Sequence, residues 1–480
     1  MTVTIDTTAT ADSLDDQRTV SISPLVSPAT VRAQHAPDEV ASATVRTGRV
    51  DTVNILNGTD DRLIVVVGPC SVHDPEAAMD YARRLAAKAE ELRDDLHIVM
   101  RVYFEKPRTT LGWKGLLNDP HLDGTYDVNT GLGIGRKLLL DVSSLGLPVG
   151  CEFLDPIMPQ YIADLVSYGA IGARTAASQV HRQLCSALSM PVGIKNSTEG
   201  DVQVAVDGTR AAAASHVFPG TDLDGQAALI RTAGNPDCHV ILRGGSDGPN
   251  YDAETVADTL ARLRKANLPE RVVIDASHGN SSKDHERQVI VLDDIAARLA
   301  AGEQGIAGVM LESFIEAGRQ DLTLGKADEL TYGQSITDAC IDWATTAAQL
   351  DRLAQAVAAR RTAGLRQNFS RGSDQAFQPG IRADSAAQRF VGQFDADRQT
   401  GRQSRPDFGQ GDASGARHQT FLAGVTDQLC VVCGRGRRTV AHLGVVQPFA
   451  WDRLEIFQCC RRAVGVQRVD ENAPSRTVCG

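Results

Sequence analysis

The sequence predicts an α/β protein built around a (β/α)₈ TIM barrel, with an N-terminal arm, an inserted β-ribbon and a disordered C-terminal tail. Three observations lead to this prediction. From residue 63 onward, eight short apolar runs alternate with segments of helical periodicity, and eight parallel βαβ units are the number that closes such a barrel. The segment 215–235 interrupts the alternation as an inserted ribbon would. After residue 361 the composition loses lysine completely and the charge balance changes sign.

The N-terminal arm comprises residues 1–58. Residues 1–36 are rich in Thr, Ser, Ala and Asp and show little periodicity, which predicts a largely disordered segment that a partner subunit can order. Residues 37–58 have weak helical character. The barrel itself is predicted to occupy residues 59–361.

The first strand and helix of the barrel have clear local signals. The apolar run 63–67 stops at Gly68 and Pro69, as a buried strand does. Asp74 can cap a helix in which Pro75 takes the first position. Apolar side chains then recur at helical spacing, so the first βα unit is well defined.

Seven further strands are predicted from apolar runs of similar length. In chain order they read HIVMRVYF, LPVGCEFL, AIGAR, PVGIKN, CHVILRG, RVVIDASH and IAGVMLES. Helices are predicted between most of them, for example at 157–168 and 252–266. A doubly wound open sheet is the competing architecture, because it is built from the same units.

A reactive side chain follows each of the eight predicted strands. In a barrel the C-terminal strand ends meet at one mouth, where the chemistry of such enzymes collects. Ordinary solvated loops would contain more small and amide side chains, so this set indicates an active site. The first reactive residues at the eight ends are Cys70, Arg101, Glu152, Arg174, Lys195, Arg243, His278 and Glu312.

One part of this set is cationic. Like charges repel, so an acidic protein gains no stability from bringing them together unless a bound anion offsets the cost. Guanidinium groups grip phosphate and carboxylate through paired hydrogen bonds, and lysine acts as a point charge or proton donor. The converging cations therefore predict substrates with several negative charges. They are Arg101, Arg174, Lys195 and Arg243, followed by Lys106 and Arg108 in the segment EKPRTT.

The other part combines a thiol, an imidazole and a carboxylate. Cys70, His278 and Glu312 are metal ligands of mixed hardness. Asp338 in SITDAC is the candidate fourth ligand, and Cys340 beside it is its main rival. Each residue alone is more often structural, but together on one barrel rim they indicate a metal site.

Composition limits the remaining possibilities. The formal net charge of −11 argues against general nucleic-acid binding. No apolar stretch approaches the length of a membrane span, and the N-terminus lacks a signal peptide pattern, which predicts a cytoplasmic protein with no membrane partner. Ten cysteines in 480 residues are too few for a dense disulfide framework.

Several long motifs resemble those of the class I 3-deoxy-D-arabino-heptulosonate 7-phosphate (DAHP) synthases. The resemblance covers about residues 50–361 and implies a metal-dependent condensation of phosphoenolpyruvate with erythrose 4-phosphate, the first step of the shikimate pathway. The motifs are GPCSVHDP, MRVYFEKPRTTLGWKGLLNDP, GAIGARTAASQVHR, PVGIKN, CHVILRGG, DASHGNSSK, GVMLES and SITDACIDW.

The resemblance also implies a role for each candidate residue. One divalent metal per subunit, of the group Mn, Fe, Co or Zn, is held by Cys70, His278, Glu312 and Asp338. Phosphoenolpyruvate is held by Arg101, Lys106, Arg174, Lys195 and Arg243. Erythrose 4-phosphate meets Lys106, Pro107, Arg108 and Thr109.

Two residues are expected to act in the chemistry. Lys106 is the candidate proton donor to the alkoxide that develops from the sugar aldehyde, and Glu152 is the candidate that positions or activates the attacking water. The metal supplies Lewis acidity for the aldehyde.

Two rival functions stay open. The sister activity on arabinose 5-phosphate is disfavoured by the KPRTT loop, and a catalytically inactive barrel that binds an aromatic amino acid or a partner enzyme is disfavoured by the intact residue set.

The resemblance further implies a homodimer or homotetramer inhibited by an aromatic amino acid at a pocket lined partly by the ribbon. Gly220 stands where phenylalanine-sensitive relatives carry serine, which favours tyrosine. A ribbon that only packs against a neighbouring subunit is the alternative.

The tail, residues 362–480, carries 16 Arg, no Lys and 11 Asp and Glu. Its main motif, CVVC at Cys430 and Cys433, is followed by the adjacent pair Cys459 and Cys460, a poor geometry for a tetrahedral zinc site. Arginine without lysine is what a shifted reading frame of a GC-rich gene produces. The tail is therefore predicted to be a frameshift or read-through product, disordered and dispensable.

Overall fold

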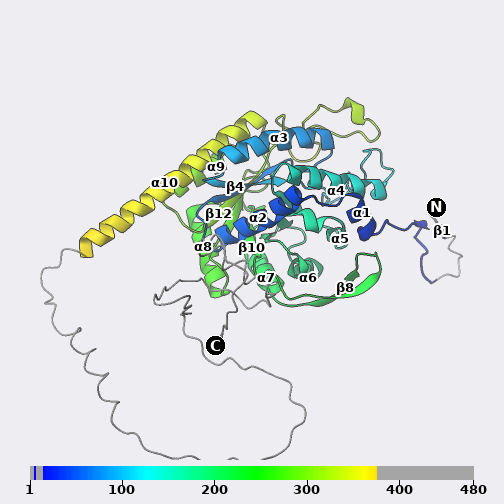
Figure 1. Ribbon diagram of the computed structural model, residues 1–480, viewed down its shortest axis with the longest axis horizontal. Coiled ribbons are helices and arrows are strands. Elements are labelled where there is room, and N and C mark those ends of the chain that lie inside the picture. The colour runs from blue at the N-terminus through cyan, green and yellow to red at the C-terminus, as the bar shows by residue number, and fades with distance from the viewer. Residues whose placement is uncertain (1–4, 7–13, 376–480) are drawn as a thin grey trace, which may run out of the picture. The chain divides into compact units, whose positions relative to one another are not determined.

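A computed structural model describes residues 5, 6 and 14–375 of the chain (Figure 1). Its centre is a closed barrel of eight parallel strands in the order β10-β11-β12-β3-β4-β5-β6-β7. The predicted (β/α)₈ barrel is therefore confirmed, and the open-sheet alternative is wrong. The barrel strands are β3 (Leu63–Gly68), β4 (Leu96–Arg101), β5 (Val149–Glu152), β6 (Tyr168–Ile171), β7 (Val192–Lys195), β10 (His239–Leu242), β11 (Val272–Asp275) and β12 (Ile306–Glu312).

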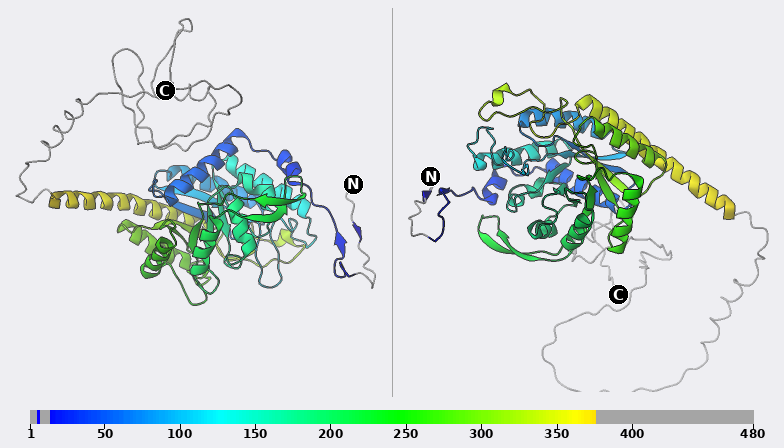
Figure 2. Two further views of the ribbon diagram at one scale, coloured as in Figure 1. Left: turned by 90° about the horizontal axis from the view of Figure 1, so that it is seen from below. Right: turned by 180° about the vertical axis from the view of Figure 1, so that it is seen from behind.

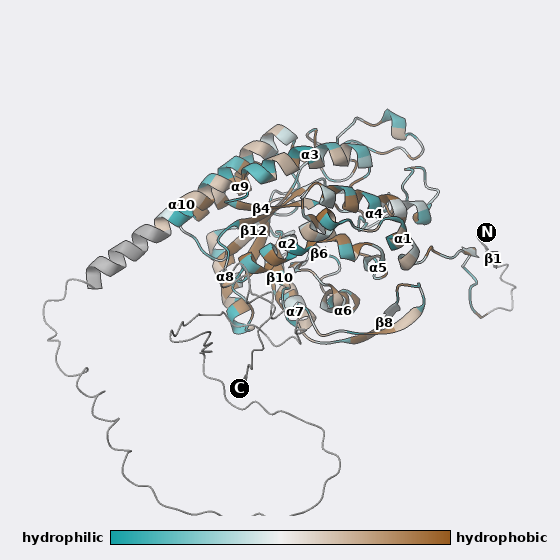
Figure 3. Cartoon of the chain, viewed as in Figure 1, coloured by the Kyte–Doolittle hydropathy of each residue, from teal (hydrophilic) through white to brown (hydrophobic). Residues whose placement is uncertain are grey.

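Alternation along each strand builds two separate apolar layers. On β3, Ile64 and Val66 join a cluster that also takes Val99, Tyr168 and Ile241 from other strands, and so fills the barrel interior. The intervening side chains of β3 pack outward against the helices. Both faces are buried, which explains why the sequence shows continuous apolar runs rather than alternation with polar residues. Figure 3 shows these strands as mostly hydrophobic inside a more hydrophilic shell of helices.

The helices of the shell follow the strands in turn. Asp74 caps the first of them by accepting hydrogen bonds from the N–H groups of Glu76 and Ala77, as its sequence signal predicts. The helix predicted at 157–168 is shorter than expected, because strand β6 already begins at Tyr168. The helices are α3 (Pro75–Glu91), α4 (Val128–Ser144), α5 (Pro159–Ile162) with the 3₁₀ turn η1 (Ala163–Leu165), α6 (Gln179–Ala187), α7 (Gln203–Ala212), α8 (Ala253–Lys265), α9 (Arg287–Ala300), the 3₁₀ turn η2 (Ala327–Glu329) and α10 (Trp343–Gln375).

The N-terminal arm is more ordered than the sequence predicts. Within it lie β1 (Ile5–Asp6), β2 (Ser21–Ile22), α1 (Pro28–Gln34) and the long helix α2 (Glu39–Leu56). The expectation of a largely disordered segment over 1–36 is wrong for α1. The reason is tertiary: the fully buried guanidinium of Arg136 donates to the carbonyl of His35 and fixes the end of α1 on the barrel.

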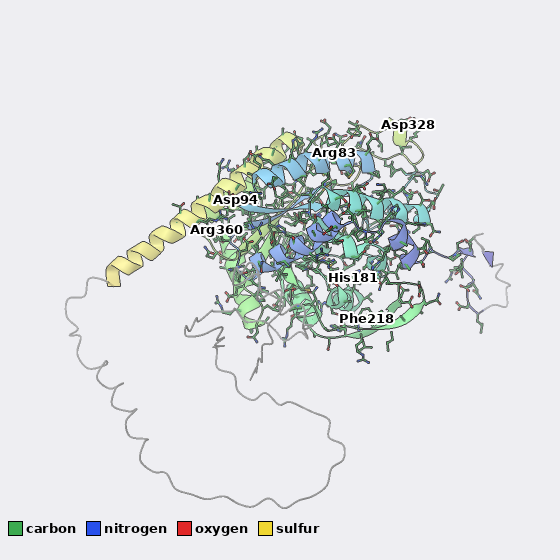
Figure 4. The ribbon with its side chains drawn as sticks, in the orientation of Figure 1. Arg83, Asp94, His181, Phe218, Asp328 and Arg360 are labelled. Atoms are coloured by element: carbon green, nitrogen blue, oxygen red, sulfur yellow. The ribbon has the colours of Figure 1, made fainter. Side chains whose placement is uncertain are left out.

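The ribbon predicted at 215–235 is confirmed. Strands β8 (Val217–Thr221) and β9 (Ala227–Arg231) pair antiparallel between α7 and β10. Figure 2 shows the ribbon at the edge of the barrel, and Figure 4 labels Phe218 on it. Its outer apolar side chains stay partly open: Val217 is 46% and Leu229 71% exposed.

The last helix, α10, runs past residue 361 and ends at Gln375. The prediction that regular structure ends at 361 is therefore wrong for residues 362–375. Extending an existing helix is far easier than nucleating one, so α10 continues even though this stretch contains two glycines. The cysteine motif and the rest of the tail lie outside the described residues. Among the described residues, no helix is both long and apolar enough to cross a membrane.

Candidate active site

The C-terminal ends of the barrel strands surround one cavity of about 470 Å³. All the site residues singled out from the sequence line it, so the structure brings together what the strand pattern predicted. They are Cys70, Arg101, Lys106, Pro107, Arg108, Thr109, Glu152, Arg174, Lys195, Arg243, His278, Glu312 and Asp338.

The candidate metal ligands occupy one arc of the rim: Cys70 and His278 follow β3 and β11, Glu312 ends β12, and Asp338 lies in the segment between β12 and α10. The ligand atoms of Cys70, Glu312 and Asp338 all lie within 4.8 Å of one another. His278 joins them less closely, with its Nε2 atom 3.7 Å from Glu312 Oε1. The rival, Cys340, is buried, does not line the cavity, and its thiol contacts the Asp338 carbonyl at 3.7 Å. A soft sulfur, two carboxylates and an imidazole suit a divalent transition metal, so this donor set fits one.

The charge around the thiol is compensated by lysine. Lys106 Nζ lies 2.9 Å from Cys70 Sγ and 2.7 Å from Asp338 Oδ2. Burial and the nearby Glu312 carboxylate raise the pKa of Cys70 to about 11, although Lys106 opposes them. The thiol is therefore protonated near neutral pH, and a bound metal ion must displace its proton.

Asp275 orients His278 within this arc. Its Oδ2 atom lies 3.0 Å from His278 Nδ1, so the other ring nitrogen faces Glu312. His278 also has a left-handed backbone, with φ of 57°, a strained conformation that folded proteins concentrate at functional sites. Burial opposes ionisation of Asp275, but Lys195 and His278 outweigh it and hold the pKa of this carboxyl well below its usual range.

The candidate anion-binding residues occupy the opposite arc, on β4, β6, β7 and β10. Two of its cations are already neutralised: Arg101 Nη2 donates to Glu312 Oε1 at 2.9 Å, and Lys195 Nζ lies 2.9 Å from Asp275 Oδ2. The sequence alone predicts that all six cations of the mouth are free to bind an anion. With Lys106 held by Asp338, half of that set is paired within the protein.

Three arginines of the mouth, Arg108, Arg174 and Arg243, form no ion pair with any described residue. Burial lowers the pKa of Arg243, and the positive charge of Arg174 adds to this effect while Asp275 opposes it. Arg174 Nε donates to Thr109 Oγ1 at 3.3 Å, which ties β6 to the loop after β4. These unneutralised groups are the natural partners of phosphate and carboxylate.

Two glutamates lie within the anion-binding arc, one at the end of β5 and one in the loop after β4. Glu152 ends β5, packed so closely on Gly172 that a Cβ there would lie 2.5 Å from its Oε1. Glu105, which sequence reasoning missed, is 4% exposed and accepts hydrogen bonds from the N–H groups of Leu154 and Asp155. Burial, opposed by these two hydrogen bonds, raises the pKa of Glu105 to about 8.

Asp275 and Glu105 were not predicted from the sequence, for the same reason. Asp275 lies inside the apolar run RVVIDASH, before its strand end, and Glu105 lies just before Lys106, beyond the first reactive residue of its strand. A carboxyl group in or beside an apolar run is a usable signal, because burial requires it to find a partner or a proton.

The chain matches the DAHP synthetase I family over residues 33–351. It is 54% identical over 347 residues to the Phe-sensitive phospho-2-dehydro-3-deoxyheptonate aldolase of Escherichia coli (strain K12), an alignment that covers 72% of this chain and 98% of that protein. It is 53% identical over 350 residues to the tyrosine-inhibited enzyme of Schizosaccharomyces pombe, covering 72% and 94%. A solved structure of phospho-2-dehydro-3-deoxyheptonate aldolase from Francisella tularensis SCHU S4 matches with a TM-score of 0.69 and 49% identity, covering 70% of this chain and 98% of that one.

Proposed function

This chain belongs to the DAHP synthetase I family and is a DAHP synthase of aromatic biosynthesis, and on that premise we propose its substrates, its metal and the roles of its site residues. It condenses phosphoenolpyruvate with erythrose 4-phosphate and water to give DAHP and inorganic phosphate. One observation supports this most strongly: unpaired arginines face a cysteine, histidine and carboxylate donor set across a single cavity.

The anion-binding arc holds the charged groups of both substrates. Arg174 and Arg243 hold the phosphate and carboxylate of phosphoenolpyruvate, with Lys195 and Arg101 beside them. Arg108 holds the phosphate of the sugar. Fixing both anions in attack geometry removes an entropic barrier of several kcal/mol.

Carbon 3 of phosphoenolpyruvate attacks the aldehyde carbon of the sugar, and a carbon–carbon bond forms. Lys106 donates a proton to the aldehyde oxygen as it becomes an alkoxide. Glu152 positions the water that adds to carbon 2, and the resulting hemiketal phosphate releases inorganic phosphate. Cys70, His278, Glu312 and Asp338 would hold a divalent metal, which supplies Lewis acidity toward the aldehyde when bound.

The direct test is phosphate release from the purified full-length chain with added Mn²⁺. Phosphate is expected with phosphoenolpyruvate plus erythrose 4-phosphate, and little with arabinose 5-phosphate in its place. Equal or better turnover of arabinose 5-phosphate would favour the sister activity. No release from either pair would favour an inactive barrel that only binds.

We further propose that an aromatic amino acid inhibits this enzyme at a site near the ribbon. The relatives from E. coli and S. pombe are named Phe-sensitive and tyrosine-inhibited, which supports an aromatic effector but not its location. A Cβ added at Gly220 would lie 2.9 Å from Ile230 Cγ1, so a serine there would have to displace Ile230. The support for tyrosine over phenylalanine comes from the residue type itself, a glycine where phenylalanine-sensitive relatives carry serine. The same phosphate assay, repeated with each aromatic amino acid added, tests which one is the effector. Stronger inhibition by phenylalanine than by tyrosine would contradict the assignment of tyrosine.

A further inference from the structure

A second group of arginines lies at the opposite, N-terminal end of the barrel. It surrounds a cavity of about 230 Å³ between the turn after α2, the starts of β11 and β12, and α10. Four arginines and two aspartates line this cavity, among them Arg271 just before β11 and Arg360 on α10. Figure 4 labels Arg360 on α10 and Asp94 in the turn between α3 and β4, whose carbonyl accepts a hydrogen bond from Arg361.

The carboxylates of this region are already engaged by the other two arginines. Arg62 pairs with Asp60 at 2.6 Å and with Asp51 at 3.0 Å. Arg361 pairs with Asp61 at 2.7 Å and also with Asp95. Arg62 and Arg361 therefore contact four carboxylates between them, and none of the four forms an ion pair with Arg271 or Arg360.

Arg271 and Arg360 form no ion pair with any described residue. Arg271 donates from Nη1 to the Glu270 carbonyl at 3.2 Å, and Arg360 donates from Nη2 to the Asp61 carbonyl at 2.5 Å. Most of the N–H donors of both guanidinium groups thus lack a protein acceptor among the described residues. Burial lowers the pKa of Arg360; Asp61 opposes this, and the charges of Arg361 and Arg271 add to it.

The backbone also leaves room for Arg271. Gly58, with φ of 73°, ends the turn after α2, and a Cβ there would lie 2.6 Å from Arg271 Nη2. Any other residue would push the guanidinium away from this wall. The charges of Arg271 and Arg360 repel one another, Asp61 offsets only part of this effect on Arg360, and an anion between the two guanidinium groups would relieve the rest.

We infer that Arg271 and Arg360 form a binding site for the phosphate group of a small anion, separate from the active site. The phosphate is either free or part of an ester, and guanidinium groups bind either through paired hydrogen bonds. An anion there links α10 to the starts of β11 and β12 and to the end of α2. Arg360 lies beyond residue 351, where the family match ends, so this pair is not contained in the matched segment.

The test measures the thermal midpoint of the full-length chain with inorganic phosphate, against chloride at equal ionic strength. Phosphate also enters the active site, so the comparison is made in Arg243→Ala, which weakens that site. At ten times the dissociation constant, a rise of roughly 2 °C is expected from the second site. Adding Arg271→Gln or Arg360→Gln should abolish this rise, whereas adding Arg210→Gln, a change at an exposed arginine of α7, should leave it intact.

Two further arms complete the test. In the first, glycerol 3-phosphate replaces inorganic phosphate. The ligand that binds more tightly shows whether the site prefers a phosphate ester or free phosphate. Circular dichroism of each variant without ligand shows that it is folded. No rise in Arg243→Ala, or a rise that persists in both Arg271→Gln and Arg360→Gln, would overturn the inference. If phosphate stabilises the chain equally with and without Arg243→Ala, the active-site assignment fails while the second site stands.

Discussion

Glu105 is a carboxyl group whose ionisation opposes folding. Its pKa of about 8 in the folded chain lies above the usual value of 4.5, because it is buried. Between these two values the folded state holds a proton that the unfolded state has released, so the stability of the protein falls as pH rises from about 4.5 to 8. Glu105→Gln removes this dependence.

Thermal midpoints of the wild type and Glu105→Gln from pH 5 to 9 check this prediction. The thermal midpoint of the variant is expected to rise relative to that of the wild type as pH rises. This difference should level off above about pH 8. A difference between the two midpoints that does not change with pH would show that Glu105 is ionised in the folded protein throughout.

A change at Arg108 tests which of the two proposed substrates this residue binds. Its guanidinium has no ion pair among the described residues, and its Nε donates to the Trp113 carbonyl at 2.8 Å. Arg108→Ala should lower kcat/KM for erythrose 4-phosphate by roughly 10- to 100-fold, the size of a lost charged hydrogen bond. The Michaelis constant for phosphoenolpyruvate should stay unchanged. Steady-state kinetics with each substrate varied in turn checks this, and an effect mainly on phosphoenolpyruvate would reverse the assignment.

At the level of elements, the loop after β4 depends on Gly115. This residue has φ of 119°, and an added Cβ would lie 1.8 Å from the Phe104 carbonyl oxygen, a backbone atom that cannot move aside. The Lys106 N–H donates to the Lys114 carbonyl at 3.0 Å in the same loop, so displacement of Gly115 displaces Lys106.

Gly115→Ala should therefore cost about 2 kcal/mol or more of unfolding free energy and most of the turnover. Gly146→Ala is the matched control, because Gly146 has φ of 80° but no atom within 4 Å of an added Cβ. It should cost about 1 kcal/mol and leave turnover intact. Denaturant unfolding and the phosphate assay measure both quantities, and equal effects of the two changes would contradict the steric argument.

Elements with strong local signals were predictable from the sequence. The run 63–67 and the Asp74 cap specify strand β3 and helix α3 without help from the rest of the chain. Helix α1 was missed, because its order depends on Arg136, a residue about a hundred positions away. The continuation of α10 beyond 361 was missed because the change in composition was read as an end of structure.

The same division holds for the site. The positions of the strand ends in the sequence predict which residues reach the mouth of the barrel, because parallel strands place their C-terminal ends together. The strand ends do not reveal which cations are free to bind an anion. Lys195 pairs with Asp275 and Arg101 pairs with Glu312 through contacts between different strands. The association of subunits and the nature of the tail stay predictions.

Across the whole molecule, the barrel separates two kinds of chemistry on one rim. The strands β11, β12 and β3 carry the soft and carboxylate donors, and the strands β4, β6, β7 and β10 carry the cations. On the proposed function, the first arc faces the sugar aldehyde and the second binds phosphoenolpyruvate. The central claim is that the first arc holds a metal required for turnover and the second holds phosphoenolpyruvate.

The most direct test measures bound Mn²⁺, binding of phosphoenolpyruvate and phosphate release on the same preparations of the wild type, Cys70→Ala and Arg243→Ala. Cys70→Ala should lose the metal and turnover, yet still bind phosphoenolpyruvate. Arg243→Ala should keep the metal and bind phosphoenolpyruvate at least about tenfold more weakly. Full turnover by Cys70→Ala, or by the wild type in a strong chelator, would contradict the account.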